Sequence, residues 1–386
     1  MTEKLYDNNA YLTEFHANVI SCVPCKKGYK IILDKTAFFP EEGGQYSDKG
    51  FLNESEVFDV QIENGVIVHY CSDFLSGEVT GKLNFEARFR NMQNHTGEHI
   101  ISGIIHSMFG GENVGFHLGD IEVTCDYDIV LSDEQLKLVE IEANKAIYKN
   151  LPVTAYYPDS EEIKGINYRS KKEIDEKLRI VTIQSVDCCA CCAPHVKTTG
   201  EIGIIKILSS MKLRGGVRLF IACGLDAFTD YSLKHSQIKA ISSLLAAKND
   251  ECAVGVERLL DNLKAEKYHL NQLSSQLAEI KIEKINKTQK DIVIFTSKCD
   301  AKALREIVNK AKEKSGNICA AFSENDINDY SYIIYSENSD VCQLATDISQ
   351  KLGGRGGGKS PMIQGSVKAE KQAIKKYFKD ALFFEF

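Results

Sequence analysis

Residues 89–105 read Phe89-Arg-Asn-Met-Gln-Asn-His95-Thr-Gly-Glu-His99-Ile-Ile-Ser-Gly-Ile-Ile105, and the fold expected for this chain is organised around them. The apolar residues of this stretch recur at helical spacing, which predicts a half-buried helix. Two histidines four residues apart lie on one face of a helix, about 6 Å apart along its axis. Their imidazoles can therefore reach a single metal ion from the same side.

A second pair of ligands follows farther along the chain, in Cys191-Cys-Ala-Pro-His195. A thiolate and an imidazole are ligands that zinc prefers. His95, His99, Cys191 and His195 together make the ligand set of a tetrahedral ion, so we predict one Zn²⁺ per chain. Incidental histidines would be the simpler interpretation of either motif alone. His106 lies too far along the helix axis to share the ion.

Composition bounds the class of protein. The chain has 386 residues, of which 43% are hydrophobic and 26% charged, and its net charge is −7. This length predicts about two to four domains with real cores. No run approaches a membrane span and the start lacks a signal-peptide pattern, so we expect a soluble, cytoplasmic protein without a membrane partner. The 13 cysteines, an odd number, do not fit a secreted disulfide framework.

The predicted class is α+β, beginning with a β-barrel-like module over residues 1–87. Short strand patterns separated by turn residues indicate such a module. It contains the glycine-rich loop 34–45, in which Gly43 and Gly44 let the backbone bend and present Gln45 to a cleft. A plain hairpin turn is the alternative interpretation of this loop.

Three further segments follow the module. Residues 88–228 are predicted to form an α+β domain that carries the metal site, and residues 289–386 a small α/β domain. Between them, 229–288 read as helix. Apolar residues recur every seven positions over 256–280, with Glu266 interrupting the seam, which predicts a short coiled coil. Its partner would be an antiparallel hairpin within the chain, turning near Gly255, or a second copy in a homodimer that the C-terminal domain could also mediate.

The C-terminal segment contains Gly353-Gly-Arg-Gly-Gly-Gly-Lys-Ser360, which matches the phosphate-loop pattern GxxxxGK[ST]. A phosphate loop needs a strand before it and a helix after it. Here residues 341–352 predict a helix and Pro361 follows at once, so nucleotide hydrolysis is disfavoured. The glycines, with Arg355 and Lys359, are predicted to contact a nucleic-acid backbone, although a solvated basic surface is the simpler interpretation on charge alone.

The same histidines also fit HxxEH, the inverted zinc-protease motif, in which Glu98 would activate a water molecule. A protease would need a further acidic ligand, and no distinct one stands out. Cys191 and His195 would then have no role. The protease is therefore the third hypothesis.

Taken together and in this order, the motifs resemble the long-form alanyl-tRNA editing proteins of the AlaX type, free-standing relatives of the editing and C-terminal parts of alanyl-tRNA synthetase. The resemblance covers nearly the whole chain. It rests on the Thr36-to-Gln45 loop, HxxxH, Asp187-xxx-Cys191-xxx-His195, Gly216-Val-Arg218 and the glycine-rich tail of a DHH-associated domain. This chain has Gly97-Glu98 where the family usually has Ala-Thr, so its pocket is expected to have its own shape.

The resemblance implies a zinc-dependent trans-editing hydrolase that cleaves the ester of tRNA(Ala) mischarged with serine, and also with glycine. It implies that 289–386 binds the tRNA. It places Thr36 and Gln45 beside the aminoacyl group, where a hydroxyl and an amide can select serine, and it makes Gly43, Gly44 and Arg218 substrate-binding residues.

Four protein ligands leave no open position on a catalytic zinc. Whether the ion activates water or positions the substrate is therefore left open by the sequence. The alternative from another class is an RNA-binding module whose zinc is structural.

Overall fold

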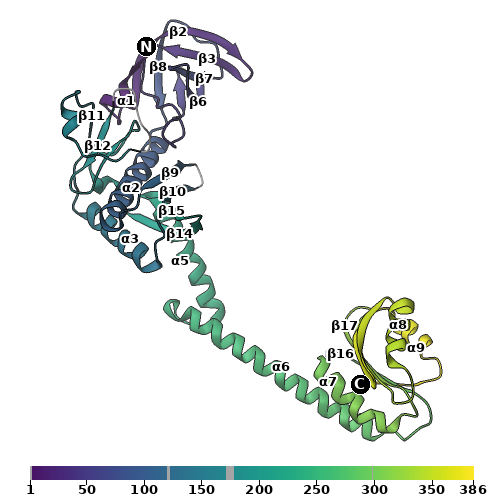
Figure 1. Ribbon diagram of the computed structural model, residues 1–386. Coiled ribbons are helices and arrows are strands. Elements are labelled where there is room, and N and C mark those ends of the chain that lie inside the picture. The colour runs from purple at the N-terminus through teal and green to yellow at the C-terminus, as the bar shows by residue number, and fades with distance from the viewer. Residues whose placement is uncertain (1, 120–121, 171–177, 298) are drawn as a thin grey trace. The chain divides into compact units, whose positions relative to one another are not determined.

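The computed structural model describes residues 2–119, 122–170, 178–297 and 299–386. It divides into two compact units, Met1–Gln237 and Ile238–Phe386 (Figure 1). Both units combine helices with sheets, which confirms the predicted α+β class. The boundaries predicted after residues 87, 228 and 288 stay predictions. Over the described ranges, no helix has the length and apolar character needed to cross a membrane.

The first unit begins with six strands that pair around a closed barrel in the order β2-β3-β7-β6-β5-β8. Inward-facing side chains such as Ile31, Leu33, Val57 and Val79 are fully or almost fully buried, because alternate residues of a barrel strand point inward. The barrel strands are β2 (Glu14–Cys25), β3 (Gly28–Leu33), β5 (Gly50–Leu52), β6 (Ser55–Glu63), β7 (Val66–Cys71) and β8 (Glu78–Leu83). The short elements are β1 (Glu3–Lys4), α1 (Leu5–Asn8) and β4 (Lys35–Thr36).

The histidine-bearing stretch forms α2 (Phe85–Phe109), the central helix of the first unit. Asn84 caps its start by accepting a hydrogen bond from Ala87 N–H, and Gly110 ends it with a φ of 71°. The prediction of a half-buried helix is wrong, because every residue from 91 to 105 is buried. The polar face that the periodicity assigns to solvent is instead covered by hydrogen-bonding partners from the rest of the unit.

Two sheets and a second helix pack around α2 (Figure 1). One sheet has the order β14-β15-β10-β9 and the other β11-β12-β13. A Cβ added at Gly97 would lie 2.3 Å from Cys223 Sγ, so the glycine permits the close approach of α2 to β15. The elements are β9 (Asn113–Leu118), β10 (Val123–Tyr127), α3 (Asp133–Tyr148), β11 (Val153–Tyr156), α4 (Glu162–Gly165), β12 (Ile180–Ile183), β13 (Asp187–Ala190), β14 (Ile205–Leu213) and β15 (Gly216–Cys223).

A buried ion pair fixes the barrel against the first turn of α2. Arg88 donates from Nε to Asp48 Oδ1 at 2.9 Å, from Nη1 to Ala10 O at 2.9 Å and from Nη2 to Ala37 O at 2.7 Å. Phe39 N–H donates to Asp48 Oδ2 at 2.6 Å. Because both charges are buried and both carry further hydrogen bonds, this pair specifies one geometry between the barrel loops and α2.

The second unit contains a six-stranded sheet of order β19-β20-β18-β17-β16-β21. Neighbouring residues of β16 face opposite sides: Ile292 and Ile294 pack under α6 and α7, whereas Val293 and Phe295 pack under α8 and α9 (Figure 1). The elements are α6 (Cys252–Glu283), β16 (Ile292–Ser297), α7 (Ala301–Ala311), β17 (Cys319–Asp326), β18 (Asp329–Tyr335), α8 (Val341–Leu352), β19 (Gly354–Lys359), β20 (Met362–Lys368), α9 (Lys371–Tyr377) and β21 (Leu382–Glu385).

The residues that match the phosphate-loop pattern lie on β19, an edge strand of this sheet. No helix begins at Lys359 or Ser360; β20 follows and pairs back onto β19. The structure therefore agrees with the prediction that this stretch is not a phosphate loop. Arg355 and Lys359 are both exposed on the strand.

The heptad seam lies on α6. Its apolar side chains, from Val256 at 41% to Leu273 at 63%, remain exposed. The chain turns at 246–251, between α5 (Leu225–Leu245) and α6, and so before the predicted position at Gly255. A hairpin covering the seam is therefore not what the described chain forms, and the coiled coil stays a proposal.

Candidate metal centre

The four predicted ligands converge. His95 and His99 come from successive turns of α2, and Cys191 and His195 from the loop after β13. Their ligand atoms all lie within 4.8 Å of one another. Cys191 Sγ is 3.5 Å from His95 Nε2 and 3.4 Å from His195 Nε2. Zinc bond lengths require tetrahedral edges of about 3.5 Å, so the donor set fits this ion.

A hydrogen-bond partner holds the remaining nitrogen of each histidine. This arrangement keeps the proton on Nδ1 and leaves Nε2 to bind the ion. The pairs are His95 Nδ1 with Gln45 Oε1 at 2.9 Å, His99 Nδ1 with Asp187 Oδ2 at 2.9 Å, and His195 Nδ1 with Thr96 Oγ1 at 3.0 Å.

Asp187 connects His99 to a second buried charge. Arg169 Nε donates to Asp187 Oδ1 at 2.8 Å, so the two carboxylate oxygens serve different partners. Burial opposes ionisation of Asp187, but the contact with His99 outweighs it and lowers the carboxyl pKa. Burial likewise opposes protonation of His99, and the bond to Asp187 nevertheless raises its pKa well above the ordinary value. The carboxylate therefore stabilises the Nδ1–H form that metal binding requires.

The electrostatics of the cluster favour the ligand states of Cys191 and His195. Burial disfavours the Cys191 thiolate, but His95 and His195 beside it hold the pKa of the thiol well below its usual range. Burial lowers the pKa of His195 to about 3. A thiolate and a neutral imidazole are the forms that bind zinc.

The loop that carries Cys191 is held by Arg179, at the start of the strand pair β12–β13. Arg179 Nη1 donates to Cys191 O at 3.2 Å and to Ala193 O at 2.8 Å, while Cys191 N–H donates to Arg179 O at 3.0 Å. These bonds fix the backbone of the ligand loop. Sequence reasoning missed both Arg179 and Arg169, because a lone arginine at no fixed spacing from the ligands carries no local signal.

The glycine-rich loop of the barrel reaches the centre as a tight turn. Glu42 and Gln45 exchange backbone hydrogen bonds of 3.2 and 3.1 Å across Gly43 and Gly44, whose φ values are 64° and 84°. A Cβ at Gly44 would lie 2.3 Å from Phe116 O. The turn is therefore a hairpin that also presents a side chain: Gln45 is fully buried against His95, and its Nε2 has no partner among the described residues.

Two predicted residues are hydrogen-bonded to partners other than the four ligands. Thr36 is fully buried in the barrel, where its hydroxyl lies 2.8 Å from His69 Nε2. His69 Nδ1–H donates to Ile31 O at 3.1 Å, so the Thr36 hydroxyl is the donor to Nε2. Arg218 donates from Nε and Nη2 to Asp126, both at 2.7 Å. It alternates on β15 with residues that pack toward α2, so it faces the other side of the sheet.

Glu98 and His106 lie outside the ligand set. Glu98 is buried and accepts hydrogen bonds of 2.6 Å from Ser102 Oγ and from Asn113 Nδ2. Its Oε2 is 3.9 Å from His99 Nε2. His106 is exposed and pairs with Glu112 at 2.7 Å, as expected for a flanking histidine. These hydrogen bonds explain how an acidic side chain can be buried on α2.

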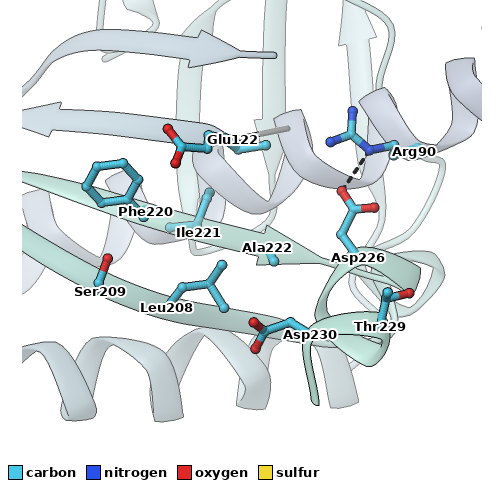
Figure 2. A pocket seen from close by; sticks show the side chains of 11 residues that line it. Arg90, Glu122, Leu208, Ser209, Phe220, Ile221, Ala222, Asp226, Thr229 and Asp230 are labelled. Carbon is cyan, nitrogen blue, oxygen red and sulfur yellow. Dashed lines mark hydrogen bonds and ion pairs between the residues drawn. The ribbon is translucent and has the colours of Figure 1, made fainter. Parts of the chain in front are cut away.

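A cavity of about 540 Å³ is lined by residues of strands β10, β14 and β15 together with residues of α2 and α5 (Figure 2). Its charged wall contains Arg90 and Asp226, which form an ion pair at 2.7 Å, together with Glu122 and Asp230. None of the four ligands lines it, so this cavity is separate from the metal centre.

Three families match successive parts of the chain. Residues 7–88 match the family described as "tRNA synthetases class II (A)". Residues 178–220 match "Threonyl and Alanyl tRNA synthetase second additional domain", and residues 289–382 match "DHHA1 domain". The second range contains Asp187, Cys191 and His195. The third confirms the predicted DHH-associated domain.

Curated relatives match over nearly the whole chain. The alanyl-tRNA editing protein AlaX-L of Pyrococcus horikoshii is 27% identical over 97% of this chain and 96% of its own length. The alanine–tRNA ligase of Methanococcus maripaludis is 30% identical over 97% of this chain and 43% of its own length. The chain thus spans less than half of the ligases that it matches. Among solved structures, the C-Ala domain of Aquifex aeolicus alanyl-tRNA synthetase is 16% identical, covering 23% of this chain and 87% of that domain, with a TM-score of 0.20. The likeness to AlaX-L and the three family matches confirm the resemblance inferred from the motifs.

Proposed function

We propose, from this full-length likeness to an alanyl-tRNA editing protein, that the chain is an aminoacyl-tRNA deacylase that hydrolyses mischarged tRNA(Ala). The observation that carries the proposal is the convergence of His95, His99, Cys191 and His195 beside the Gln45 turn. The proposed substrates are Ser-tRNA(Ala) and Gly-tRNA(Ala), and the proposed ion is Zn²⁺. Because translation uses aminoacyl-tRNA in the cytoplasm, that is the proposed place of action.

The residues around the centre have complementary tasks in ester hydrolysis. A bound zinc ion would supply positive charge to the oxygen of the ester carbonyl as it becomes an oxyanion. The Gln45 carboxamide holds His95 through Oε1, and its buried Nε2–H donors have no partner among the described residues. Gln45 is thus the residue proposed to contact the aminoacyl group. Thr36 supports the base of the same loop from the barrel core, since its hydroxyl is already donated to His69.

A closed ligand set favours a second candidate, an RNA-binding module with a structural ion. Four protein ligands are typical of structural zinc sites. The two candidates differ in one measurement. Purified protein is incubated with Ser-tRNA(Ala), Gly-tRNA(Ala) and Ala-tRNA(Ala), and its metal content is assayed beside Cys191→Ala. The deacylase is supported if the parent protein hydrolyses the seryl ester and spares the alanyl ester. In Cys191→Ala, both this hydrolysis and the bound zinc should be lost. Stable esters with one bound zinc support the binding module.

The second unit is proposed to bind the body of the tRNA. Arg355 and Lys359 are exposed on the edge strand β19, whose glycines leave the backbone accessible. A contact with a phosphate contributes to the salt dependence of affinity, with a slope change of about one per contact. The variant Arg355→Gln should therefore lower the slope of log K against log salt by about one while leaving the zinc content unchanged. An unchanged slope would remove Arg355 from the interface.

The exposed seam on α6 is proposed to pair with a second copy of the chain. Val256, Leu263, Leu270 and Leu277 lie on one stripe, which is too apolar for a helix surface facing water. In a parallel pair, Glu266 would face Glu266 of the second chain, and the two like charges would repel each other in the seam. In an antiparallel pair, Glu266 faces a leucine instead. The antiparallel arrangement is therefore favoured. Sedimentation of the protein and of Leu270→Lys tests this, because the variant should be monomeric at concentrations where the parent is a dimer.

A further inference from the structure

Two buried oxygen atoms next to the Gln45 turn have no hydrogen-bond partner within the described parts of the chain. They are Glu42 Oε2 and the hydroxyl of Tyr6, a residue of α1 that is only 1% exposed. Buried polar atoms in native proteins are nearly always bonded, and the exceptions mark a missing water, ion or ligand. An unsatisfied carboxylate oxygen is the costlier of the two, because burying a charge without a partner is strongly unfavourable.

The turn places Glu42 on the same side as the metal centre. Glu42 and Gln45 are a directly opposed pair across Gly43 and Gly44. Side chains of such a pair point to the same face, with Cβ atoms about 5 Å apart. Gln45 reaches His95 on that face. The Glu42 side chain therefore lies beside Gln45, which itself contacts His95, one of the proposed metal ligands.

The other acidic group near Tyr6 already has its partners. Asp7 accepts a hydrogen bond of 2.8 Å from the Tyr157 hydroxyl, and Arg179 Nε lies 3.8 Å from its carboxylate. Glu42 has no ion-pair partner in the described ranges. The Cys192 thiol, 3.5 Å from where a Cβ of Gly43 would lie, hydrogen-bonds the Glu42 side chain but supplies no positive charge, and Glu42 Oε2 stays without a partner among the described residues. The site thus combines one uncompensated negative charge with a neutral acceptor. This combination suits a small cation with several N–H donors.

We propose that Glu42, assisted by the Tyr6 hydroxyl, binds the α-ammonium group of the aminoacyl ester. This inference rests on the proposed deacylase function. The ammonium nitrogen of an amino acid lies about 2.5 Å from its carbonyl carbon. An ester carbonyl held at the metal centre therefore carries its ammonium group into the space beside the turn. Gln45 Nε2–H then serves an acceptor of the substrate, while Glu42 and Tyr6 serve its cationic donor.

Two esters of tRNA(Ala) separate this role from a structural one. The first is the seryl ester, and the second is the glyceroyl ester (the ester of glyceric acid), in which a hydroxyl replaces the ammonium group of the serine. Glu42→Gln keeps the size of the side chain and removes its charge. We expect it to lower kcat/KM for the seryl ester by about 10- to 100-fold, as for the loss of a charge-assisted hydrogen bond. For the glyceroyl ester we expect a change within about twofold.

The neighbouring acid provides a matched control. Glu41 is exposed and accepts a hydrogen bond of 2.7 Å from Gln61 Nε2, so Glu41→Gln should leave both esters unaffected. Tyr6→Phe should lower kcat/KM for the seryl ester by a few-fold and spare the glyceroyl ester. Zinc content should equal that of the parent in all three variants, which excludes a collapsed centre as the cause.

Three outcomes would overturn the inference. Equal losses on both esters in Glu42→Gln would show that Glu42 only shapes the turn. No loss on either ester would show that the two oxygen atoms hold a water molecule. If the unsubstituted protein cleaves neither ester, the deacylase function fails and this inference fails with it, a result distinct from the other two.

Discussion

Replacing Asp187 by asparagine should weaken metal binding, and the structure predicts how the loss is distributed. Asp187 accepts from His99 Nδ1–H at 2.9 Å and from Arg169 Nε–H at 2.8 Å through separate oxygens. An asparagine has one acceptor oxygen and one NH₂ donor. Its amide must therefore direct donors at either the imidazole or the guanidinium, and both of these are donors in the parent protein.

The choice between the two orientations follows from charge. A guanidinium cannot give up its proton, whereas an imidazole can move its proton to the other nitrogen. The amide oxygen should therefore turn to Arg169, and its NH₂ to His99. His99 then accepts at Nδ1 and carries its proton on Nε2, the nitrogen that must bind the ion. Loss of such a supporting contact typically reduces metal affinity 10- to 100-fold, which is about 1.4–2.8 kcal/mol.

The assay is a zinc competition against a chromophoric chelator at neutral pH, with the dissociation constant as its readout. Asp126→Asn is the matched control, because Asp126 pairs with Arg218 at 2.7 Å in the same domain but contacts no histidine. It should leave the zinc dissociation constant unchanged. The reasoning is refuted if Asp187→Asn binds zinc as tightly as the parent, or if Asp126→Asn loses affinity to the same extent.

Three further expectations concern stability and the turn. Arg88→Ala removes one partner of a buried ion pair and should lower the free energy of unfolding by about 3–5 kcal/mol, measured by urea denaturation. Gly44→Ala forces a Cβ to within 2.3 Å of Phe116 O at a φ of 84° and should reduce deacylation. Gly65→Ala is the control: its φ is 78° but the space around it is open, so it should cost only about 1 kcal/mol of stability. Burial lowers the pKa of His69 to about 4. Between pH 6.5 and 4 this histidine is protonated in the unfolded chain but not in the folded one, so the free energy of unfolding should fall by up to about 3 kcal/mol as pH drops through that window. His69→Gln should flatten this pH dependence when unfolding is measured by denaturation at several pH values.

The convergence of the four candidate metal ligands could be predicted from the sequence because their signal is local. HxxxH places two ligands on one helix face whatever surrounds it, and a CxxxH motif supplies the complementary donors. The partners that orient these ligands have no such signal. Arg169 and Arg179 reach the centre through the bridge between residues 169 and 189 and through the pairing of β12 with β13, which no short pattern encodes.

The burial of α2 could not be predicted for a related reason. Periodicity identifies an apolar stripe, but it does not distinguish a polar face in water from one that is hydrogen-bonded inside the protein. Glu98 and Ser102 belong to the second kind. Likewise, the seam on α6 predicted the helix, but its periodicity does not distinguish a partner within the chain from a second copy of the chain.

The separation of the ligands along the chain has a consequence for biosynthesis. His95 and His99 emerge together, but Cys191 and His195 follow only after α3 and the β11-β12-β13 sheet, so closing the site requires a long loop to be ordered first. The nascent helix alone offers two imidazoles and so a weak, exchangeable site. For the proposed ion, tight capture would therefore be a late event in folding, because it requires the central helix and the ligand loop to be docked first.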